Sequence, residues 1–281
     1  MKIKKNSLMN TTEKKNIQTA RASLGQHFIK DKNIIDMIVD SAGNLKNKVI
    51  YEVGPGSGNL TRALLSTTAS KIIAIEKDKR CCHALSEMAK NSKDRLKLIE
   101  GDALLFDEKS LSLTSMINIS NLPYNISTEL LFKWIDQCAP FEKYILMFQK
   151  EVANRIIAKN NSKSYGRLSV IVQWQYYVKL LFDVPSNAFI PKPKVNSSVI
   201  LLLKRSKPIA PAPYESLKLI LKHTFGNRRK MLRSSLKSLT KNPKKLLCEA
   251  NIDEKKRAEN LTIEEFCNLA SCYEKNCTNT S

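Results

Sequence analysis

The fold of this chain is decided by a stretch that reads Val49-Ile50-Tyr51-Glu52-Val53-Gly54-Pro55-Gly56-Ser57-Gly58. Its first half is an apolar run typical of a buried strand, and its second half is a glycine-rich turn. Residues 59–66 then have the apolar spacing of a helix. Strand, glycine turn and helix in this order bring a nucleotide-like ligand close to the backbone, because glycine lacks the Cβ that would block the approach. Three glycines alone also fit any tight turn or a dinucleotide-binding fold.

Two further apolar runs end in carboxylates that suit the same ligand. The run 72–75 ends in Glu76, about 20 residues after the glycines, where an acid can bind both hydroxyls of a ribose. The run 96–101 ends in Asp102-Ala103, which suits hydrogen bonding to the edge of an adenine. Because the carboxyl ends of consecutive parallel strands share one edge of a sheet, we expect both acids to lie at one ligand site.

A fourth apolar run, 116–120, ends in Asn121-Leu122-Pro123-Tyr124. The exocyclic amine of adenine is a poor nucleophile, because its lone pair is delocalised into the ring. A site that alkylates this amine must accept its hydrogen bonds and hold the flat base. Asn121 supplies a side-chain acceptor, the backbone carbonyl near Pro123 can supply a second, and Tyr124 offers a stacking face. The tetrapeptide therefore predicts methyl transfer to an amine, with the methyl donor bound at the glycine turn.

The rest of the chain divides by pattern into an α/β part and a helical part. From residue 49 to 204 strands alternate with helical patterns, which predicts a mostly parallel sheet with a late antiparallel pair. Prolines at 208, 211 and 213 mark a linker, and residues 214 to about 273 are helical in pattern. We expect a disordered basic arm over 1–22, the α/β domain over 23–207, a helical domain over 208–275 and a tail over 276–281.

Charge restricts the kind of partner. The chain has 281 residues with 47 Lys and Arg against 26 Asp and Glu, a formal net charge of +21 that points to a polyanion. RNA, DNA and an anionic membrane surface all fit the charge, but the chain has no apolar stretch of membrane-spanning length and no basic helix with a clean apolar face. The densest basic run reads Arg228-Arg229-Lys230-Met231-Leu232-Arg233. It predicts a helix that presents charge to phosphates, or simply a solvated face.

The seven cysteines include no Cys-x-x-Cys pair, and no secretory signal is evident. We therefore expect free thiols in a reducing, cytoplasmic compartment. The five-residue spacing of Cys267, Cys272 and Cys277 does not suit zinc, so we expect no metal site. Without a heptad pattern or an exposed apolar stripe, we expect a monomer.

Seven motifs in order and spacing resemble the ribosomal RNA adenine dimethyltransferases, over roughly residues 21–270. The first five are Gly25-Gln26-His27-Phe28, Glu52-Val53-Gly54-Pro55-Gly56-Ser57-Gly58-Asn59-Leu60-Thr61, Ile75-Glu76-Lys77-Asp78, Gly101-Asp102-Ala103 and Asn121-Leu122-Pro123-Tyr124. Two later motifs, 189–197 and 225–232, look like those of the KsgA-type enzymes of the small ribosomal subunit. The family often has Asn where this chain has His27, and an imidazole can also hydrogen-bond a cofactor.

The resemblance implies a Rossmann-like class I methyltransferase fold with a small C-terminal all-helical domain. It also implies S-adenosyl-L-methionine as donor, and N6,N6-dimethylation of two adjacent adenosines near the 3′ end of small-subunit (16S) rRNA during ribosome biogenesis. The partner would be this rRNA within the immature subunit. The expected cofactor-binding residues are Gln26, His27, Ile29, Glu52, Gly54, Gly56, Glu76, Lys77, Asp102, Ala103 and Asn121. The expected catalytic residues are Asn121, Leu122, Pro123, Tyr124 and Phe189, with Tyr124 and Phe189 clamping the two faces of the base. The expected RNA-binding residues are Arg228, Arg229, Lys230 and Arg233.

Other functions share parts of this pattern. The Erm-type enzymes, which modify the large ribosomal subunit, share the front half of the motifs and match the back half less well. A non-catalytic rRNA-binding assembly factor, or a relative of the mitochondrial transcription factors, would bind nucleic acid without methylation. The set of Glu76, Asp102 and the Asn121 motif argues against such a protein, because a pure binding module needs no donor pocket. A DNA adenine methyltransferase would carry a similar tetrapeptide but fits less well.

Overall fold

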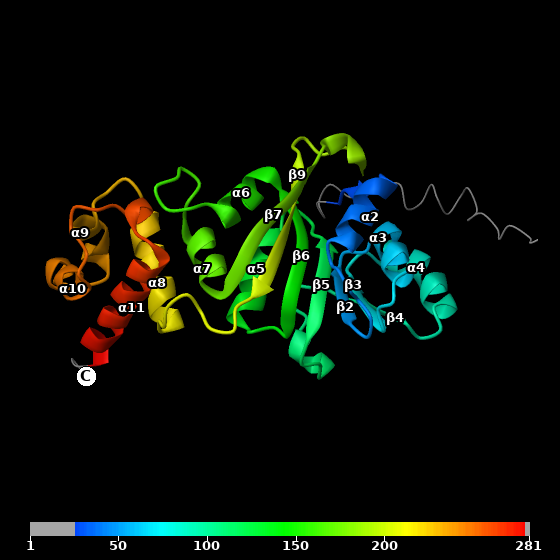
Figure 1. Cartoon of the computed structure of the whole chain (residues 1–281), viewed down its shortest axis with the longest axis horizontal. Helices are drawn as coiled ribbons and strands as arrows, with labels where there is room; N and C mark the ends of the chain where they lie inside the picture. The colour runs from blue at the N-terminus through cyan, green and yellow to red at the C-terminus, as the bar shows by residue number, and fades with distance from the viewer. Residues whose placement is uncertain (1–25, 279–281) are drawn as a thin grey trace, which may run out of the picture. The chain divides into compact units, whose positions relative to one another are not determined.

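The computed structural model describes residues 26–278 and contains one large mixed sheet (Figure 1). The predicted basic arm, residues 1–22, lies outside the described residues. The seven strands lie in the order β4-β3-β2-β5-β6-β9-β7. They are β2 Val49–Val53, β3 Lys71–Glu76, β4 Leu96–Glu100, β5 Met116–Asn121, β6 Phe141–Gln149, β7 Tyr176–Val184 and β9 Ser197–Lys204. Strand β2 pairs in parallel with β3 and β5, β3 pairs with β4, and β5 pairs with β6. The predicted α/β fold class is confirmed.

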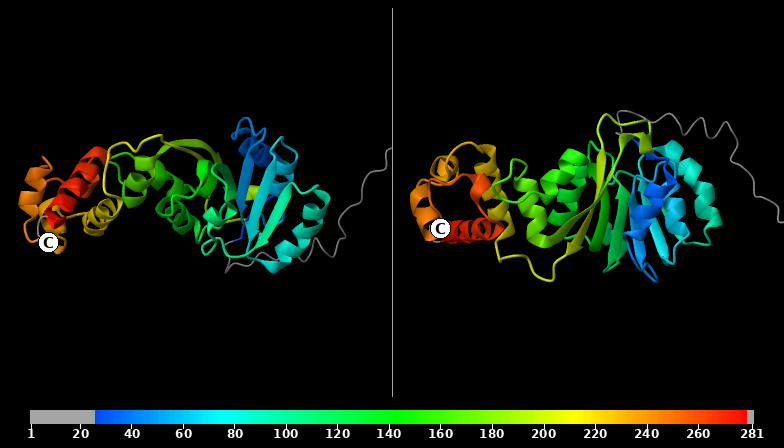
Figure 2. Two further views of the ribbon diagram at one scale, coloured as in Figure 1. Left: turned by 90° about the horizontal axis from the view of Figure 1, so that it is seen from below. Right: turned by 45° about the horizontal axis from the view of Figure 1, so that its top comes forward.

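The central strands are buried on both faces. Ile50, Ile72 and Ile119, from three neighbouring strands, are each no more than 1% exposed. Continuous apolar strands of this kind need helices on both sides of the sheet. Figures 1 and 2 show α2, α3 and α4 along one face and α5 along the other. These helices are α2 Lys32–Asp40, α3 Asn59–Leu65, α4 Lys79–Asn91 and α5 Ser127–Asp136.

Side chains cap the starts of α2 and α4 but not the start of α5. The carboxylates of Asp31 and Asp78 cap α2 and α4 by accepting a hydrogen bond from the amide two residues on. The sequence suggests that Ser127 or Thr128 lies near the N-cap of α5, but the N-cap is Ile126, which gives no side-chain hydrogen bond. The Ser127 hydroxyl instead donates to the carbonyl oxygen of Tyr124 at 3.2 Å, so the turn after the tetrapeptide uses it.

A second, two-stranded sheet joins distant parts of the chain. Strand β1 (Phe28–Ile29) pairs antiparallel with β8 (Phe189–Ile190), which follows the short 3-10 helix η3 (Ser186–Ala188). Strands of two residues show no alternation of apolar and polar side chains, so the sequence does not predict them.

The chain divides into two compact units. Of the described residues, the first unit contains 26–150 together with 180–201, and the second contains 151–179 together with 202–278. Helices of the second unit are α6 Lys150–Ile157, α7 Arg167–Gln175, α8 Tyr214–Gly226, α9 Leu232–Ser235, α10 Pro243–Glu249 and α11 Ile263–Thr278. Residues 151–179 thus group with the C-terminal helices, and the domain boundary at 207 stays a prediction. Residues 276–278 belong to the last turn of α11, and the tail boundary at 276 stays a prediction. The Thr278 hydroxyl donates to the Glu274 carbonyl within this last turn.

Within residues 26–278, no helix is long and apolar enough to cross a membrane. The seven cysteines all lie within the described residues, and none of them forms a disulfide.

Candidate functional site

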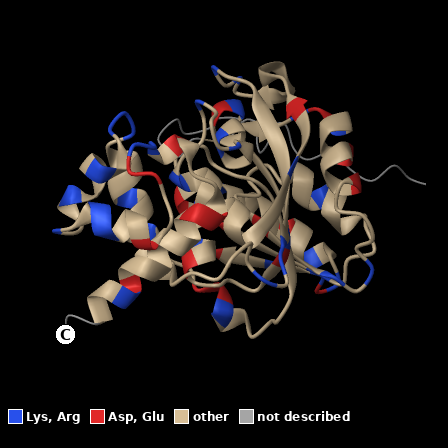
Figure 3. Ribbon diagram, turned by 60° about the vertical axis from the view of Figure 1, so that its left-hand side comes forward, with Lys and Arg blue, Asp and Glu red and all other residues tan. Residues whose placement is uncertain are grey.

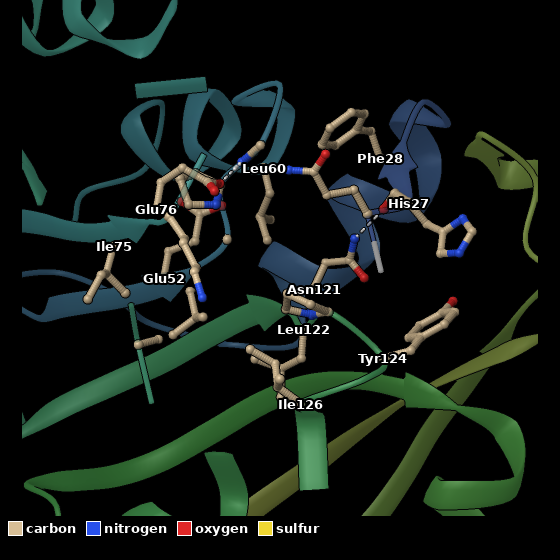
Figure 4. A pocket seen from close by; sticks show the side chains of 18 of the residues that line it. His27, Phe28, Glu52, Leu60, Ile75, Glu76, Asn121, Leu122, Tyr124 and Ile126 are labelled. Carbon is tan, nitrogen blue, oxygen red and sulfur yellow. Dashed lines mark hydrogen bonds between the residues drawn. The ribbon is translucent and has the colours of Figure 1, made fainter. Parts of the chain in front are cut away.

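The first unit contains a cavity, open to solvent, at the carboxyl ends of the parallel strands. Every residue that the sequence predicts to bind a cofactor lines it, from Gln26 to Asn121. Leu122, Pro123 and Tyr124 also line it, so the tetrapeptide and the glycine turn face one space. Figure 4 shows Glu76 and Ile75 at one end, His27 and Tyr124 at the other, and Asn121 between them. Phe28, Asn59, Leu60, Ile75 and Leu104 line the cavity as well, although none of them is among the expected site residues.

The glycine turn is fixed at Gly56. This residue has φ +54°, and a Cβ there would lie 2.4 Å from the Phe28 ring. The Gly56 amide donates to Glu76 Oε2 at 3.0 Å. Glycine is therefore needed for both the backbone conformation and the close approach of Phe28.

Glu76 is buried and bonded to the backbone through both oxygens. Its Oε1 accepts from the Asp78 amide at 2.8 Å, and its Oε2 accepts from Gly56. Burial raises the pKa of Glu76, while these amide hydrogen bonds oppose the rise. Each carboxylate oxygen can accept a further hydrogen bond, so the side chain still offers acceptors to a ligand in the cavity.

Asp102 follows the end of β4 and, unlike Glu76, accepts a hydrogen bond from a lysine. Lys77 Nζ donates to its Oδ2 at 2.7 Å, and the Leu104 amide donates to its Oδ1 at 2.9 Å. The hydrogen bond from Lys77 is the largest cause that lowers the pKa of Asp102. Asp102 is therefore ionised at neutral pH and acts as an acceptor.

Glu52, at the end of β2, is 1% exposed. Burial raises its pKa to about 8, the Thr61 hydroxyl opposes the rise, and repulsion from Glu76 adds to it. Among the described residues, however, Thr61 Oγ1 and Glu52 Oε2 have no hydrogen-bond partner. Burial is the largest cause of the raised pKa, and it does not depend on that contact. Glu52 is therefore largely protonated at neutral pH, and can donate a hydrogen bond into the cavity that it lines.

Asn121 is the last residue of β5, and only the nitrogen of its side-chain amide has a hydrogen-bond partner among the described residues. Its Nδ2 donates to the His27 carbonyl at 2.8 Å, whereas its Oδ1 is buried and has no partner among the described residues. A buried acceptor without a partner is costly and uncommon. In a cavity-lining residue, it indicates that a ligand supplies the missing donor.

Tyr124 and His27 form an aromatic wall at the same end. Their ring centroids lie 5.2 Å apart with the planes inclined by 31°. The Tyr124 hydroxyl forms a short hydrogen bond with the Ser197 hydroxyl, and His27 Nδ1 donates to the Pro191 carbonyl at 2.8 Å. His27 is thus held in a loop contact and also lines the cavity. Ser197 is not among the expected site residues, although it ends the motif 189–197. Its hydroxyl bonds the Tyr124 hydroxyl and so fixes the tyrosine ring.

Phe189 does not line the cavity. It is 1% exposed and packs in the hydrophobic core that includes Ile29 and Val199. The prediction that Phe189 covers the second face of a base is not supported, because its ring is enclosed by other apolar side chains.

The four predicted RNA-binding residues lie in the second unit and separate into two kinds. Arg228 Nε donates to Glu259 at 3.0 Å, and Arg233 pairs with Glu254 at 2.8 Å. Arg229 and Lys230 are exposed. The expected continuous helix is wrong here, because α8 ends at Gly226 and a turn closed by the Lys230 amide and the Asn227 carbonyl precedes α9. Figure 3 shows that Lys and Arg recur along these C-terminal helices.

The cavity therefore combines a glycine turn, two acidic strand ends, an unpaired amide oxygen and an aromatic wall. The described residues contain no cluster of three or more His, Cys, Asp and Glu side chains that could hold a metal ion. Such an arrangement suits a nucleoside-like molecule in one half and a flat amine-bearing base in the other.

The family model for ribosomal RNA adenine dimethylase matches residues 17–275. A Rhizobium etli (strain CIAT 652) protein named ribosomal RNA small subunit methyltransferase A is 46% identical over 256 residues, covering 90% of this chain and 92% of that protein. A Rhodospirillum rubrum protein of the same name is 46% identical over 251 residues, covering 89% and 87%.

Two solved structures are also similar. A dimethyladenosine transferase from Plasmodium falciparum has a TM-score of 0.75 and 26% identity, covering 89% of this chain and 98% of that one. The 23S rRNA methyltransferase ErmE has a TM-score of 0.66 and 21% identity, covering 88% and 99%. At 21% identity, the similarity to ErmE shows only that the two proteins share a fold.

The Glu52→Gln variant should lose part of the pH dependence of stability. The pKa of Glu52 is raised from an ordinary value of 4.5 to about 8 in the folded chain. As pH rises through this window, the unfolded chain releases the proton first, so the folded state becomes less stable. Relative to the parent protein, the variant should gain unfolding free energy across this window, by at most roughly 5 kcal/mol. Thermal unfolding at a series of pH values measures this. A difference that does not vary with pH would contradict the assignment.

Gly56→Ala should cost more stability than Gly43→Ala. Both glycines have positive φ, at +54° and +70°, but a Cβ at Gly43 meets nothing within 4 Å. The pair therefore separates the clash with Phe28 from the backbone strain that both variants share. We expect a difference of about 1–3 kcal/mol in unfolding free energy, as for other overpacked sites. Urea titration measures it, and equal losses would show that Phe28 moves away freely.

Proposed function

Because the chain belongs to the ribosomal RNA adenine dimethylase family, we propose that it dimethylates N6 of two adjacent adenosines near the 3′ end of small-subunit (16S) rRNA. S-adenosyl-L-methionine would be the methyl donor. The reaction would form part of rRNA processing in ribosome biogenesis, in the cytoplasm, with a monomeric enzyme acting on the immature small subunit.

Support for the small subunit comes from relatives across most of the chain. Proteins named ribosomal RNA small subunit methyltransferase A share about 46% identity over about 90% of it. The 23S rRNA methyltransferase ErmE matches at 21%, which argues for a shared fold and not for a shared substrate. The large-subunit activity is therefore the second candidate.

The observation that carries the proposal is the unpaired Oδ1 of Asn121. An exocyclic amine supplies the N–H donor that this oxygen lacks. The Leu122 backbone carbonyl would accept the second amine hydrogen of an unmethylated adenine. Two acceptors in this arrangement direct the nitrogen lone pair away from the pocket wall and toward the donor half of the cavity.

The residues of the other half fit S-adenosyl-L-methionine. Glu76 would accept hydrogen bonds from the ribose hydroxyls, and Asp102 from the adenine amine, since both carboxylates keep free acceptor capacity. The left-handed Gly56 lets the backbone approach the ligand. Protonated Glu52 would stabilise the end of the site nearest the glycine turn by donating a hydrogen bond.

Catalysis would consist mainly of orientation. The sulfonium of the donor supplies a methyl group that is already activated. Asn121 and Leu122 would hold the amine in line with the bond to that methyl, and Tyr124 would stack on the base. Base stacking of this kind contributes about 1–3 kcal/mol, and the adenosine must leave its own stack to reach the ring.

RNA binding would rely on charge spread over a wide surface. The formal charge of +21 exceeds what the pocket needs, which favours a large folded polyanion such as a ribosomal particle. Arg229 and Lys230 are exposed and would contact phosphates directly. Arg228 and Arg233 pair with acids and would shape the turn that presents the exposed pair.

Asn121→Ala should abolish most methyl transfer while it leaves RNA affinity nearly unchanged. Loss of a preorganised polar contact to the reacting group lowers kcat by roughly 10²–10³-fold, whereas phosphate contacts elsewhere dominate affinity. Single-turnover methylation and filter binding measure the two effects. Asn187→Ala is the matched control, because Asn187 is exposed and does not line the cavity. Near-normal turnover in Asn121→Ala would contradict the assignment.

The substrate is tested by incubating the protein and labelled S-adenosyl-L-methionine with immature small subunits and, in parallel, with large subunits. Mass spectrometry then maps the methylated adenines. We expect two adjacent dimethyladenosines in small-subunit rRNA. Label confined to large-subunit rRNA would move the protein to the Erm type. Tight RNA binding without label would favour the non-catalytic assembly factor.

A further inference from the structure

A buried ion pair lies behind the cavity and lines no part of it. Lys133, on α5, and Glu108, which begins the 3-10 helix η2 (Glu108–Leu111), have side chains that are 10% and 1% exposed. Their charged atoms lie 2.9 Å apart. Glu108 also accepts hydrogen bonds from Trp134 Nε1 at 2.8 Å and from the Tyr51 hydroxyl at 3.2 Å. The acid is thus saturated by three different side chains.

Lys133 does more than neutralise Glu108. Its ammonium also donates to the carbonyl of Ala103 at 2.7 Å and, in a short contact, to the carbonyl of Phe106. A lysine ammonium has three hydrogens, and here they serve one carboxylate and two backbone carbonyls. Both carbonyls belong to the loop after β4, which begins at Gly101 and contains Asp102 and Ala103.

That loop forms one side of the cavity. Asp102, Ala103 and Leu104 line it, while the amides of Leu105 and Phe106 both donate to the Asp102 carbonyl at 3.0 Å. A clamp on the carbonyls of Ala103 and Phe106 therefore holds the tight turn on both sides of Leu104. The helix that carries Lys133 begins four residues after Pro123, so the clamp connects the tetrapeptide to the acidic loop.

We propose that Lys133, held by Glu108, is a positioning residue that sets the Asp102–Ala103 turn at the spacing from α5 that the donor's adenine requires. The inference rests on the proposed function, because it takes S-adenosyl-L-methionine as the ligand of that turn. Lys133 does not touch the ligand. It acts through the backbone of the loop. The position of α5, the helix after the tetrapeptide, thereby determines the position of the loop at the donor site.

A purely structural role for the pair is the competing explanation. Removal of one member leaves a buried, uncompensated charge, which destabilises a protein whatever else the pair does. Lys133→Met alone cannot separate the two roles. Glu108→Gln/Lys133→Met removes both charges together and keeps an acceptor for Trp134 and Tyr51. It therefore restores much of the stability without restoring the clamp.

The test compares donor affinity with stability in the full-length protein. Isothermal titration with S-adenosyl-L-methionine gives Kd, thermal unfolding gives Tm, and methylation assays give KM for donor and for RNA separately. In the double variant, we expect the donor Kd and KM to rise about tenfold or more, as the loss of hydrogen bonds to a charged group predicts. The KM for RNA should stay within about threefold, because phosphate contacts elsewhere set RNA affinity.

Lys143→Met is the matched control. Lys143 is also a partly buried lysine that donates to a backbone carbonyl, that of Ala42 at 3.0 Å, and neither residue lines the cavity. This variant should lower Tm without changing the donor Kd. Parent-like donor affinity in the double variant would overturn the positioning role. Failure of the parent protein itself to bind S-adenosyl-L-methionine would instead overturn the proposed function.

Discussion

The hydrogen bond from the Gly56 amide to the Glu76 carboxylate is the contact on which the rest of the site depends. It fixes the turn after β2 against the end of β3, and so joins the glycine motif to the first acid. Because Glu76 also accepts from the Asp78 amide, the same carboxylate orders the start of α4. The cost is burial of an acid, which raises its pKa and is offset by the amide donors. A ligand that brings hydroxyl donors would relieve part of that cost.

The segment that contains β1 depends on this turn. Phe28 packs against the bare Cα of Gly56, and the neighbouring backbone is held from three sides. Asn121 donates to the His27 carbonyl, Asn59 donates to the Ile29 carbonyl, and the Lys30 amide donates to the Ala188 carbonyl. A short strand that could not be stable alone is thus ordered by contacts from β5, α3 and η3. Residues far apart in the sequence are thereby brought to one wall of the cavity.

The sequence predicts well what depends on strand order and poorly what depends on packing across the fold. Gly56, Glu76, Asp102 and Asn121 were placed together correctly, because ends of parallel strands share an edge. Phe189 is expected at the base but lies in the core, since a Phe between prolines fits either a ligand surface or a core. The pairing of Arg228 with Glu259 was also hidden, because the acid lies 31 residues away.

Lys133 shows the same limit most clearly. In the sequence, it is one of many lysines in the chain and lies on an amphipathic helix, and nothing local distinguishes it from a solvated charge. Only the fold reveals that its ammonium meets two carbonyls and a buried acid. Long-range polar contacts of this kind leave no periodic pattern and no fixed spacing in the sequence. The motifs that line the cavity have both.

The orientation of Asn121 follows from these contacts. An amide can be turned over so that its oxygen and nitrogen exchange places, and its neighbours decide which orientation is stable. Here the neighbour is the His27 carbonyl, which can only accept, so the nitrogen must face it and the oxygen must face the cavity. A turned amide would set two acceptors against each other. The β1 segment therefore does more than border the site, because it turns a buried acceptor, which has no partner among the described residues, toward an entering amine.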